Sequence, residues 1–432
     1  MVSGDGPIYY PENYPGADLG AKIQNAVQEL PASGGTIDAR RFTGNQAISV
    51  TVTIDRPVVL LLGHAQLIIS ATPGILTVGT GRLSLEGAPL EGTRLFTSLA
   101  QGDMIQHTAN SMFQCKNIYF APTVTQTGGA AISIVPTTYA NRHLVQECDF
   151  ESLYRGIVIG NANTILIDSC GFANTINAGI QSSYIAAAPD SGQTYITNCV
   201  FGTNDAASTA ACVSWLDSSG LYMVNNTILA HAYGVLVDCT QDVGAFNEFM
   251  FYNNRISHQR SYGILCRRST STAILQGIQV FGNSFGLTNA NATAGFSLRT
   301  LSAGFAQNVI IQGNYFSMTL ASHQGCEIAG GTNITIGGNM FTTSHAAATA
   351  ITVGSVPVGL CVLPNAYYGF TTPFANASAT TVVYPAAVSP PADGEVAMLV
   401  QRNVGGVITT QQVSVGAEDS GGAGFRVLRV PN

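Results

Sequence analysis

The sequence predicts an all-β solenoid, and three observations support this prediction: a recurring phrase, its steady spacing and a composition poor in charge. The phrase is a short apolar stretch, then Asn or Cys, then an aromatic residue or Ile two positions later. Eight copies end at residues 150, 172, 201, 228, 256, 285, 316 and 341. The intervals are 22, 29, 27, 28, 29, 31 and 25 residues, as expected when each copy is one turn of a coil and loop lengths vary.

The composition excludes several classes of protein. Only 9% of the 432 residues are charged, whereas an ordinary globular domain is about a quarter charged. Apolar residues are plentiful at 46% and the net charge is only -7, which argues against disorder. Lys22 and Lys116 are the only lysines, so a basic nucleic-acid footprint is absent. The chain has no run of 18 apolar residues, so no membrane span is predicted. The N-terminus as written lacks the features of a signal peptide.

One position of the phrase changes from Cys to Asn along the chain. We interpret it as an interior ladder, in which reduced thiols stack first and Asn amides then hydrogen-bond from turn to turn. An odd total of nine Cys argues against a complete set of disulfides. The chain has no paired Cys/His spacing of the kind that binds a metal, so we expect no cofactor. Ca²⁺ is the one ion that the sequence leaves as a candidate. The ladder positions are Cys148, Cys170, Cys199, Asn226, Asn254, Asn283, Asn314 and Asn339.

The chain divides into three predicted parts. Residues 1–47 form an N-terminal cap, because apolar residues recur at helical spacing over 16–30, with Asp18 as the helix N-cap and Pro31 after its end. Residues 48–363 form the coil, with about 10–12 turns. Residues 364–432 are an exit segment and a small β-hairpin over 396–430, which we expect to cap the coil or to contact another subunit.

Charged residues, scarce elsewhere, gather on the second strand of successive turns. When these strands are aligned on their apolar residues, Asp238, Arg267 and Arg299 fall in one outward column. Asp217 lies one residue past this column, and Glu327 faces the same side by the period of two. Stacked turns are about 5 Å apart, so these side chains should nearly touch. The column is either a catalytic groove or a salt-bridge ladder that compensates stacked charges.

Two kinds of sugar chemistry fit such a column. Hydrolysis of a glycosidic bond needs two carboxyl groups, for which Asp217 with Asp238, or Asp238 with Glu248 or Asp242, are the candidates. Elimination from a uronic acid needs a cation beside the substrate carboxylate and a base. The candidate cations are Arg267, Arg268 and Arg299, and an Arg or His would be the base.

Other residues between 205 and 300 are candidate substrate-binding groups. His231 and His258 flank the same turns, either as solvated loop residues or as catalytic ones. Trp215, the only Trp, points inward as core in our alignment, and outward as a sugar-stacking platform if the alignment slips by one residue. Several tyrosines of this stretch could also line a sugar groove: Tyr222, Tyr233, Tyr252 and Tyr262.

The Gly-Ala-Asp, helix, Pro-Ala-Ser-Gly-Gly-Thr-Ile opening and the Asn-x-Phe turns resemble the pectate-lyase-like superfamily of right-handed parallel β-helices. The opening looks like the N-terminal cap of its tailspike and pectate-lyase-3 branch, and the resemblance covers residues 14–363. It implies a right-handed parallel β-helix with an N-terminal capping helix. Members include polysaccharide lyases, glycoside hydrolases, epimerases, fructan-cyclising transferases and phage tail fibres, and many are trimers. The polygalacturonase motifs and the calcium-binding Asp clusters of pectate lyases are not found.

The resemblance and the charged column together predict a carbohydrate-active enzyme that acts on a glycosidic bond of a polysaccharide or oligosaccharide. Hydrolysis or transfer is favoured over elimination. The alternative is a non-catalytic structural or adhesive rod, such as a phage tail fibre or a surface protein. An enzyme predicts two carboxylates in an open groove, whereas a rod predicts paired charges without a concavity. The family further implies a homotrimer and a secreted or extracellular location.

Overall fold

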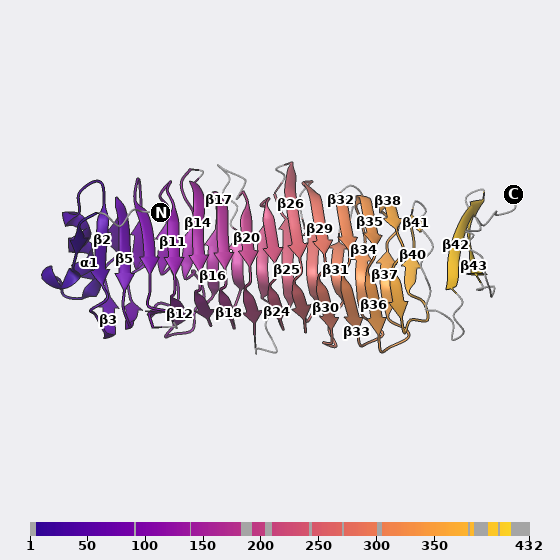
Figure 1. Ribbon diagram of the computed structural model, residues 1–432, viewed down its shortest axis with the longest axis horizontal. Coiled ribbons are helices and arrows are strands. Elements are labelled where there is room, and N and C mark those ends of the chain that lie inside the picture. Colours follow the sequence, from indigo (N-terminus) through magenta and orange to yellow (C-terminus); the bar gives the residue numbers. More distant parts are fainter. Residues whose placement is uncertain are drawn as a thin grey trace, which may run out of the picture.

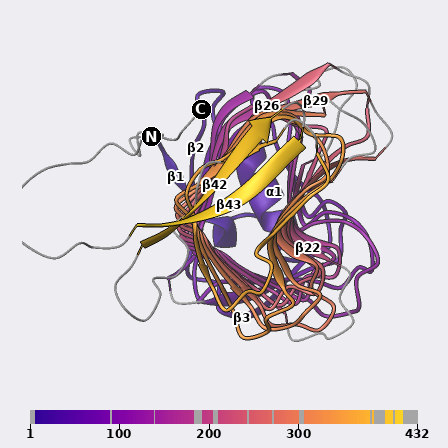
Figure 2. The ribbon, with the colours of Figure 1, turned by 90° about the vertical axis from the view of Figure 1, so that its right-hand side faces the viewer.

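The structure, a computed structural model, is a coil of β-strands with a single α-helix near its beginning (Figure 1). It describes residues 6–89, 92–138, 140–182, 192–203, 210–241, 244–269, 272–299, 305–378, 381–383, 396–404 and 407–415. Each turn of the coil contributes one strand to each of three parallel sheets, which we call A, B and C in the order in which a turn visits them. The sheets form the three sides of the cross-section seen in Figure 2.

Sheet A has 15 strands. In spatial order they are β1 (Ile8–Tyr9), β2 (Gly35–Ala39), β5 (Pro57–Leu62), β8 (Arg82–Glu86), β11 (Phe113–Lys116), β14 (Ala140–Gln146), β17 (Ala162–Asp168), β20 (Thr194–Thr197), β23 (Leu221–Val224), β26 (Ala245–Tyr252), β29 (Ile274–Phe281), β32 (Ala306–Gln312), β35 (Thr332–Gly337), β38 (Val358–Val362) and β41 (Val382–Val383).

Sheet B has 13 strands. They are β3 (Gly44–Ile48), β6 (Ala65–Ile69), β9 (Arg94–Thr97), β12 (Tyr119–Pro122), β15 (Asp149–Glu151), β18 (Gly171–Ala173), β21 (Val200–Gly202), β24 (Thr227–Leu229), β27 (Arg255–Ser257), β30 (Ser284–Leu287), β33 (Tyr315–Met318), β36 (Met340–Thr343) and β39 (Ala366–Tyr368).

Sheet C also has 13 strands. They are β4 (Val52–Ile54), β7 (Ile75–Thr77), β10 (Ile105–His107), β13 (Ile132–Ile134), β16 (Arg155–Ile159), β19 (Ala178–Ser182), β22 (Ala211–Leu216), β25 (Tyr233–Cys239), β28 (Tyr262–Arg268), β31 (Ala294–Arg299), β34 (Gln324–Ile328), β37 (Thr349–Val353) and β40 (Phe374–Asn376).

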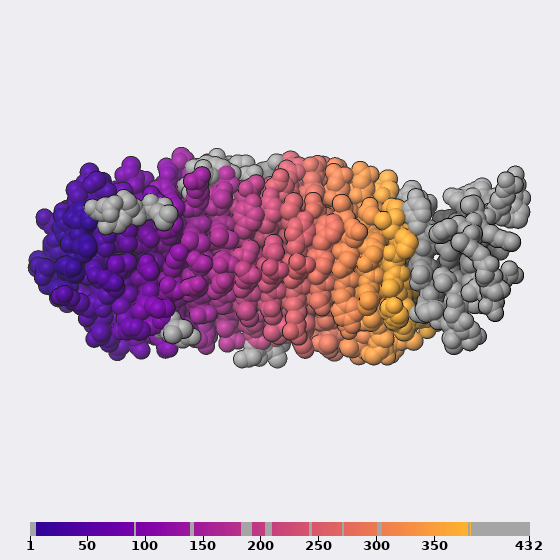
Figure 3. All heavy atoms as spheres, in the orientation of Figure 1, coloured from indigo at the N-terminus to yellow at the C-terminus, as the bar shows by residue number. Residues whose placement is uncertain are grey.

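The expected all-β solenoid is therefore confirmed, with about 13 turns where 10–12 were predicted. The difference arises at the ends of the coil. Strand β3 starts before residue 48, and β39, β40 and β41 continue the three sheets beyond residue 363. The first part of the segment that looks like an exit from the coil, in strands β39, β40 and β41, thus still pairs with the preceding turns. The stacked turns form an elongated rod (Figure 3).

The inside of the coil is filled by columns of identical side chains. The aromatic residue of each repeated phrase points inward from sheet B and stacks on its counterparts in neighbouring turns. Phe150 and Phe172 have ring centroids 4.8 Å apart, and Phe172 and Phe201 are 4.6 Å apart. A second stack runs from Phe285 through Phe316 and Phe341 to Tyr367. Parallel in-register strands place each residue above its equivalent, so one repeated residue type generates a continuous column.

The Cys and Asn ladder is confirmed at the corner between sheets A and B. The thiols of Cys148, Cys170 and Cys199 are buried and each donates to the carbonyl two residues earlier, at 3.3, 3.3 and 3.2 Å. All nine cysteines are free thiols. From Asn226 onward each backbone N–H and each amide Nδ2 donates to Oδ1 of the next Asn, at 2.9–3.0 Å. The ladder includes one further rung, Asn365, which accepts from Asn339. Buried amides are thereby satisfied from turn to turn.

The helix α1 (Leu19–Glu29) covers the first turns, and a short 3₁₀-helix (Pro11–Asn13) precedes it. Asp18 caps α1 by accepting from the Ala21 N–H at 2.8 Å, as predicted. The apolar face of α1 is buried in the same core as Ile48 and Val52 of the first turns, so the helix covers the open apolar end of the coil (Figure 2). The predicted cap helix is confirmed.

Strands β42 (Val396–Val404) and β43 (Val407–Val415) form a separate antiparallel pair near the C-terminus. The alternating pattern over residues 396–430 predicted a small β element here. Residues 416–430 of that prediction lie outside the described residues. Its expected role as a cap or subunit contact remains a prediction.

Candidate functional site

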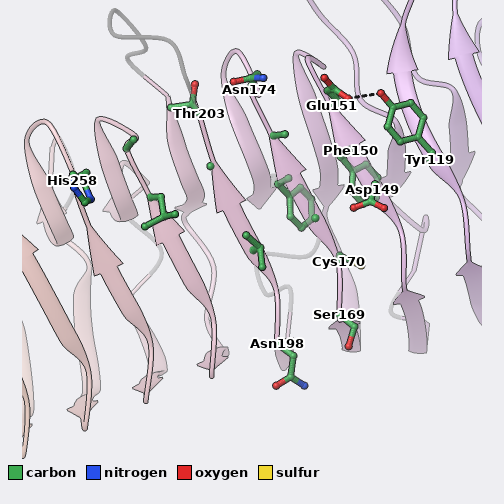
Figure 4. A pocket seen from close by; sticks show the side chains of 17 residues that line it. Tyr119, Asp149, Phe150, Glu151, Ser169, Cys170, Asn174, Asn198, Thr203 and His258 are labelled. Carbon is green, nitrogen blue, oxygen red and sulfur yellow. Dashed lines mark hydrogen bonds between the residues drawn. The ribbon is translucent and has the colours of Figure 1, made fainter. Parts of the chain in front are cut away.

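A groove with a volume of about 810 Å³ lies on the outer face of sheet B. It extends from β12 across β15, β18 and β21 to the turns that follow β24 and β27 (Figure 4). Ser169 and Asn198 line it where the strands of sheet B begin, and Asn174 and Thr203 line it where the strands end. The groove therefore crosses several turns of the coil.

A change in side-chain size along sheet B produces this groove. In register, Tyr119 of β12 lies beside Asp149 of β15, which lies beside Gly171 of β18. The second outward column passes from Glu151 to Ala173 and Gly202. The long outward side chains of β12 and β15 are thus followed by Gly171 and Ala173 on β18 and by Val200 and Gly202 on β21. A Cβ placed on Gly202 would meet nothing within 4 Å, so this part of the sheet is open.

Two carboxylates stand on the outer face of β15. Asp149 and Glu151 are partly exposed and flank the buried Phe150, so they point to the same side of the strand. At about 3.3 Å per residue their Cα atoms are about 6.6 Å apart. The Tyr119 hydroxyl donates to Glu151 Oε2 (Figure 4). The Arg94 guanidinium lies 5.2 Å from the centroid of the same Tyr119 ring.

The Asp149 side chain leans away from Tyr119 and toward β18 of the next turn. A Cβ on Gly171 would stand only 2.2 Å from Asp149 Oδ1, so the carboxylate occupies the space that a side chain at residue 171 would need. The two carboxylates consequently diverge, Glu151 toward β12 and Asp149 toward β18. Apart from the His258 imidazole, the remaining polar side chains of the lining carry hydroxyl or amide groups. No Lys or Arg is among the described residues that line the groove.

His258 is the one predicted site residue that lines the groove. It follows β27 with a left-handed φ of +61°, in the same turn column as Asn174 and Ala230. Its side chain is exposed, and Nδ1 lies 3.2 Å from Ser257 Oγ. His258 stands at the end of the groove remote from Asp149 and Tyr119 (Figure 4).

The predicted charged column exists on sheet C with the expected register. Asp238 pairs with Arg267, and Arg267 with Arg299, on adjacent strands. Asp238 is only 4% exposed, and its Oδ2 accepts from Arg267 Nε at 2.7 Å. Ser269 Oγ also donates to this carboxylate at 2.8 Å. Asp238 is thus enclosed and fully hydrogen-bonded, as in the salt-bridge alternative.

Two neighbours of this column hold loops in place. Asp217 is 4% exposed and accepts from the Thr240 hydroxyl and from the Gln241 N–H, the latter at 2.9 Å. Arg268 donates to the carbonyls of Thr272 and Ala273 at 3.0 and 3.1 Å. The predicted Asp217 and Asp238 pair is therefore engaged with protein groups on adjacent turns and does not face the groove.

Arg299 and Glu327 gather beside Tyr262 at the C-terminal side of the column. The exposed Arg299 donates through Nη1 to the Tyr262 hydroxyl. Glu327 Oε2 accepts from Ser297 Oγ at 2.7 Å. Burial raises the pKa of Tyr262, and the charge of Glu327 adds to this effect, whereas Arg299 opposes it. Tyr262 itself is only 4% exposed.

Three other expectations meet different outcomes. Trp215 is fully buried, so the inward alignment is confirmed. His231 was expected in a solvated loop or a catalytic position; the solvated alternative is wrong, because the side chain is fully buried and burial lowers its pKa to about 4. Glu248 lies in β26 of sheet A and accepts from the Tyr222 hydroxyl, so it does not pair with Asp238. Asp242 lies outside the described residues.

Sequence reasoning missed Asp149, Glu151 and Tyr119. The signal was present in the repeated phrase: the residue before each inward aromatic is Asp149, then Gly171, then Val200. The residues on both sides of Phe150 are acidic, whereas Gly or Ala flanks Phe172. An outward carboxylate pair next to a smooth turn indicates a groove once the turns are stacked.

Comparison with known proteins supports the architecture. Residues 100–247 match the family described as the right handed beta helix region. The structure of the Azotobacter vinelandii mannuronan C-5 epimerase AlgE4 A-module is similar, with a TM-score of 0.55 and 14% identity, over 87% of this chain and 99% of that one. A tailspike variant of E. coli bacteriophage HK620 in complex with a pentasaccharide has a TM-score of 0.52 and 12% identity, over 89% of this chain and 81% of that one. None of the curated proteins matches the chain in sequence.

The chain accordingly has the fold of a right-handed parallel β-helix. At these identities the similarity concerns the fold alone. Within the described parts of the chain, no three His, Cys, Asp or Glu residues gather in an arrangement that could hold a metal ion. No helix of the described residues is long and apolar enough to cross a membrane.

Proposed function

We propose that this protein binds a polysaccharide along the groove of sheet B and hydrolyses a glycosidic bond with Asp149 and Glu151. The observation that carries the proposal is the pair of outward carboxylates on β15 at the edge of an open groove. The carboxyl groups of inverting glycosidases lie about 6.5–9.5 Å apart and those of retaining enzymes about 5–5.5 Å, and the divergence of Asp149 from Glu151 favours the wider spacing. The divergence of the two side chains leaves room for a water molecule between one carboxylate and the sugar.

Each carboxylate receives a distinct role. Glu151 accepts from the Tyr119 hydroxyl, so it is suited to act as the general base that removes a proton from the attacking water. Asp149 then protonates the oxygen of the leaving sugar. The bond between the anomeric carbon and that oxygen breaks as the water oxygen adds from the opposite face. Tyr119, held under Arg94, is a positioning residue for Glu151.

The lining favours a neutral sugar chain. Asn174, Asn198, Ser169 and Thr203 offer amide and hydroxyl groups that both donate to and accept from sugar hydroxyls. Ala173, Val200 and Leu229 offer apolar surface for the C–H face of a sugar ring. Two carboxylates without a lining cation would repel a uronate. Because the groove passes over successive turns, it suits several linked sugar units.

The test is incubation with neutral glucans and fructans and with anionic uronans, followed by product mass and reducing-end analysis. We expect saturated products from a neutral polymer, with inversion of the anomeric configuration. Asp149→Asn and Glu151→Gln should each lower the rate by about 10²-fold or more. Glu86→Gln, an exposed carboxylate change in β8, is the matched control and should retain full activity. Full activity in both groove variants would refute the assignment.

Elimination at sheet C is the second candidate, and the contact of Arg299 with Tyr262 favours it. Arg299 would neutralise the carboxylate of a uronate, and Tyr262 would carry the proton. An unsaturated product that is lost in Arg299→Ala and retained in Glu151→Gln would select this reaction. No product from any polymer would favour a non-catalytic structural or adhesive rod.

The assembly and location of the protein belong to the same proposal. We expect a homotrimer that acts outside the cell, where polysaccharides are accessible. Light scattering at micromolar concentration measures the assembly, and a monomer mass would refute the trimer.

A further inference from the structure

A second hollow lies on another face of the coil, where strands of sheet A begin. It measures about 340 Å³ and crosses four turns, from Asn163 of β17 to Asn247 and Glu248 of β26. Every described residue that lines it is polar or Gly: Asn163, Gly192, Gln193, Ser219, Gly220, Asn247 and Glu248. None of these residues lines the groove of sheet B.

The hollow depends on backbone that lacks side chains. Gly220 has a left-handed φ of +66°, and a Cβ there would stand 2.3 Å from the Gly192 carbonyl oxygen. Two successive turns therefore approach each other closely without filling the space outside them. Asn163 Oδ1 accepts from the Gln193 N–H at 3.1 Å, and Ser219 Oγ accepts from the Asn247 N–H at 3.0 Å. These bonds fix the polar lining to the backbone.

Two stacked tyrosines stand beside the hollow and orient its side chains. The Tyr195 and Tyr222 rings have centroids 4.6 Å apart and are nearly parallel at 17°. Tyr222 donates to Glu248 Oε2, and Tyr195 donates to Gln193 Oε1 at 3.3 Å. The carboxylate and the amide that face a ligand are thus pre-organised, which reduces the entropy lost on binding.

Glu248 occupies a position that its neighbours fill with glycine. Its φ is +67°, and the positions beside it on adjacent turns are Gly220 and Gly277, with φ of +66° and +68°. A left-handed conformation costs a residue with a Cβ more than it costs glycine. Arg142 and Thr164 also adopt it, in β14 and β17 of the same sheet, and Glu248 differs from them because its carboxylate lines the hollow and accepts from Tyr222.

We propose that this hollow is a second binding site for a neutral saccharide, separate from the groove and without catalytic function. Amide, hydroxyl and carboxylate groups around a small hollow match the alternating donors and acceptors of a sugar ring. One carboxylate, with no cation among the described lining residues, disfavours an anionic sugar. Two sites on one rod hold a polymer more tightly than either alone, because the second contact is intramolecular.

The test uses the Asp149→Asn/Glu151→Gln protein as background, so that no substrate is consumed. A panel of neutral gluco-, manno-, galacto- and fructo-oligosaccharides is titrated by calorimetry. We expect two binding events. One of them disappears in Glu248→Gly, and its affinity falls at least tenfold in Tyr222→Phe. The affinity of the other event should stay within twofold of its value in the background protein. Glu86→Gln serves again as the control and should keep both.

Glu248→Gly also separates function from folding. Because glycine adopts the left-handed conformation without strain, this variant should melt no lower than its parent protein while losing the second event. The proposal is overturned if both binding events persist in Glu248→Gly, or if no binding event is lost when the Glu248 carboxylate is removed. Failure of the groove is distinguishable, since a protein whose groove binds nothing would still show one event that Glu248→Gly abolishes.

Discussion

Asp149 occupies the space directly above Gly171 on the next turn, where a Cβ would lie 2.2 Å from the carboxylate oxygen. This contact joins two strands that are neighbours in sheet B and 22 residues apart in the chain. The absence of a side chain at residue 171 is therefore what allows the Asp149 carboxylate to lean over the groove.

Gly171→Ala should consequently impair catalysis without unfolding the coil. The methyl group displaces the Asp149 carboxylate, and misplacement by about 1 Å can lower a rate by about 10²-fold. Residue 171 is partly exposed on the outer face of β18, so the free energy of unfolding should change by less than about 1 kcal/mol. Rates on the neutral polymer and chemical denaturation curves measure the two effects. Glu86→Gln, at an exposed position of β8 away from the groove, is the control.

Asp238→Asn should have the reverse effect. The variant loses the ionic hydrogen bond to Arg267 at a buried carboxylate, which should lower the free energy of unfolding by about 2 kcal/mol. Its activity per folded molecule should stay unchanged, because the carboxylate faces protein groups. Denaturation and specific activity are measured on the same preparation. Lost activity with unchanged stability would instead return the charged column of sheet C to a catalytic role.

Acid should destabilise the coil through two interior histidines. Burial lowers the pKa of both His107 and His231 to about 4, below the ordinary value of about 6.5. The unfolded chain thus binds these protons first. Stability is fully present above pH 6.5, and each histidine should remove about 3 kcal/mol as the pH falls from about 6.5 to about 4.

Denaturation between pH 4 and 7 measures this loss, with His107→Gln and His231→Gln as variants that cannot take up the proton. Each variant is less stable than the wild type at pH 7, and the difference should shrink toward pH 4. A difference that is constant over this range would show that the imidazoles do not control the acid response.

The ladder should tolerate Cys better than Ala where thiols give way to amides. Asn226 accepts from the Cys199 N–H at 2.9 Å and donates to Asn254. Asn226→Ala leaves buried polar groups unpaired and should cost about 3 kcal/mol. Asn226→Cys restores volume and a donor, as Cys199 Sγ already donates to the Thr197 carbonyl at 3.2 Å, so it should cost less. Equal losses of stability would contradict this account.

The fold can be predicted well from the sequence and the site only poorly, for a physical reason. Interior columns such as Phe285 on Phe316 need the same residue in every turn, so they appear as a repeat that can be read directly. A groove depends on contrast between turns, as between Asp149 and Gly171, and it becomes visible only when the register is known. Glu248 shows the same limit. Strand β25 of sheet C ends at Cys239 and β26 of sheet A begins at Ala245, so proximity to Asp238 in sequence does not bring the two together.

The Asn ladder gives the rod a direction. From Asn226 to Asn339 each amide donates to the oxygen of its C-terminal neighbour, so the amide dipoles of the row all point the same way along the axis. Each inner rung is polarised from both sides, whereas Asn365 turns its Nδ2 back to the Leu363 carbonyl and donates to no further rung. The opposite end of the rod is sealed by α1. The two ends of the row are therefore unequal, and the ladder should lose its hydrogen bonds from Asn365 inward.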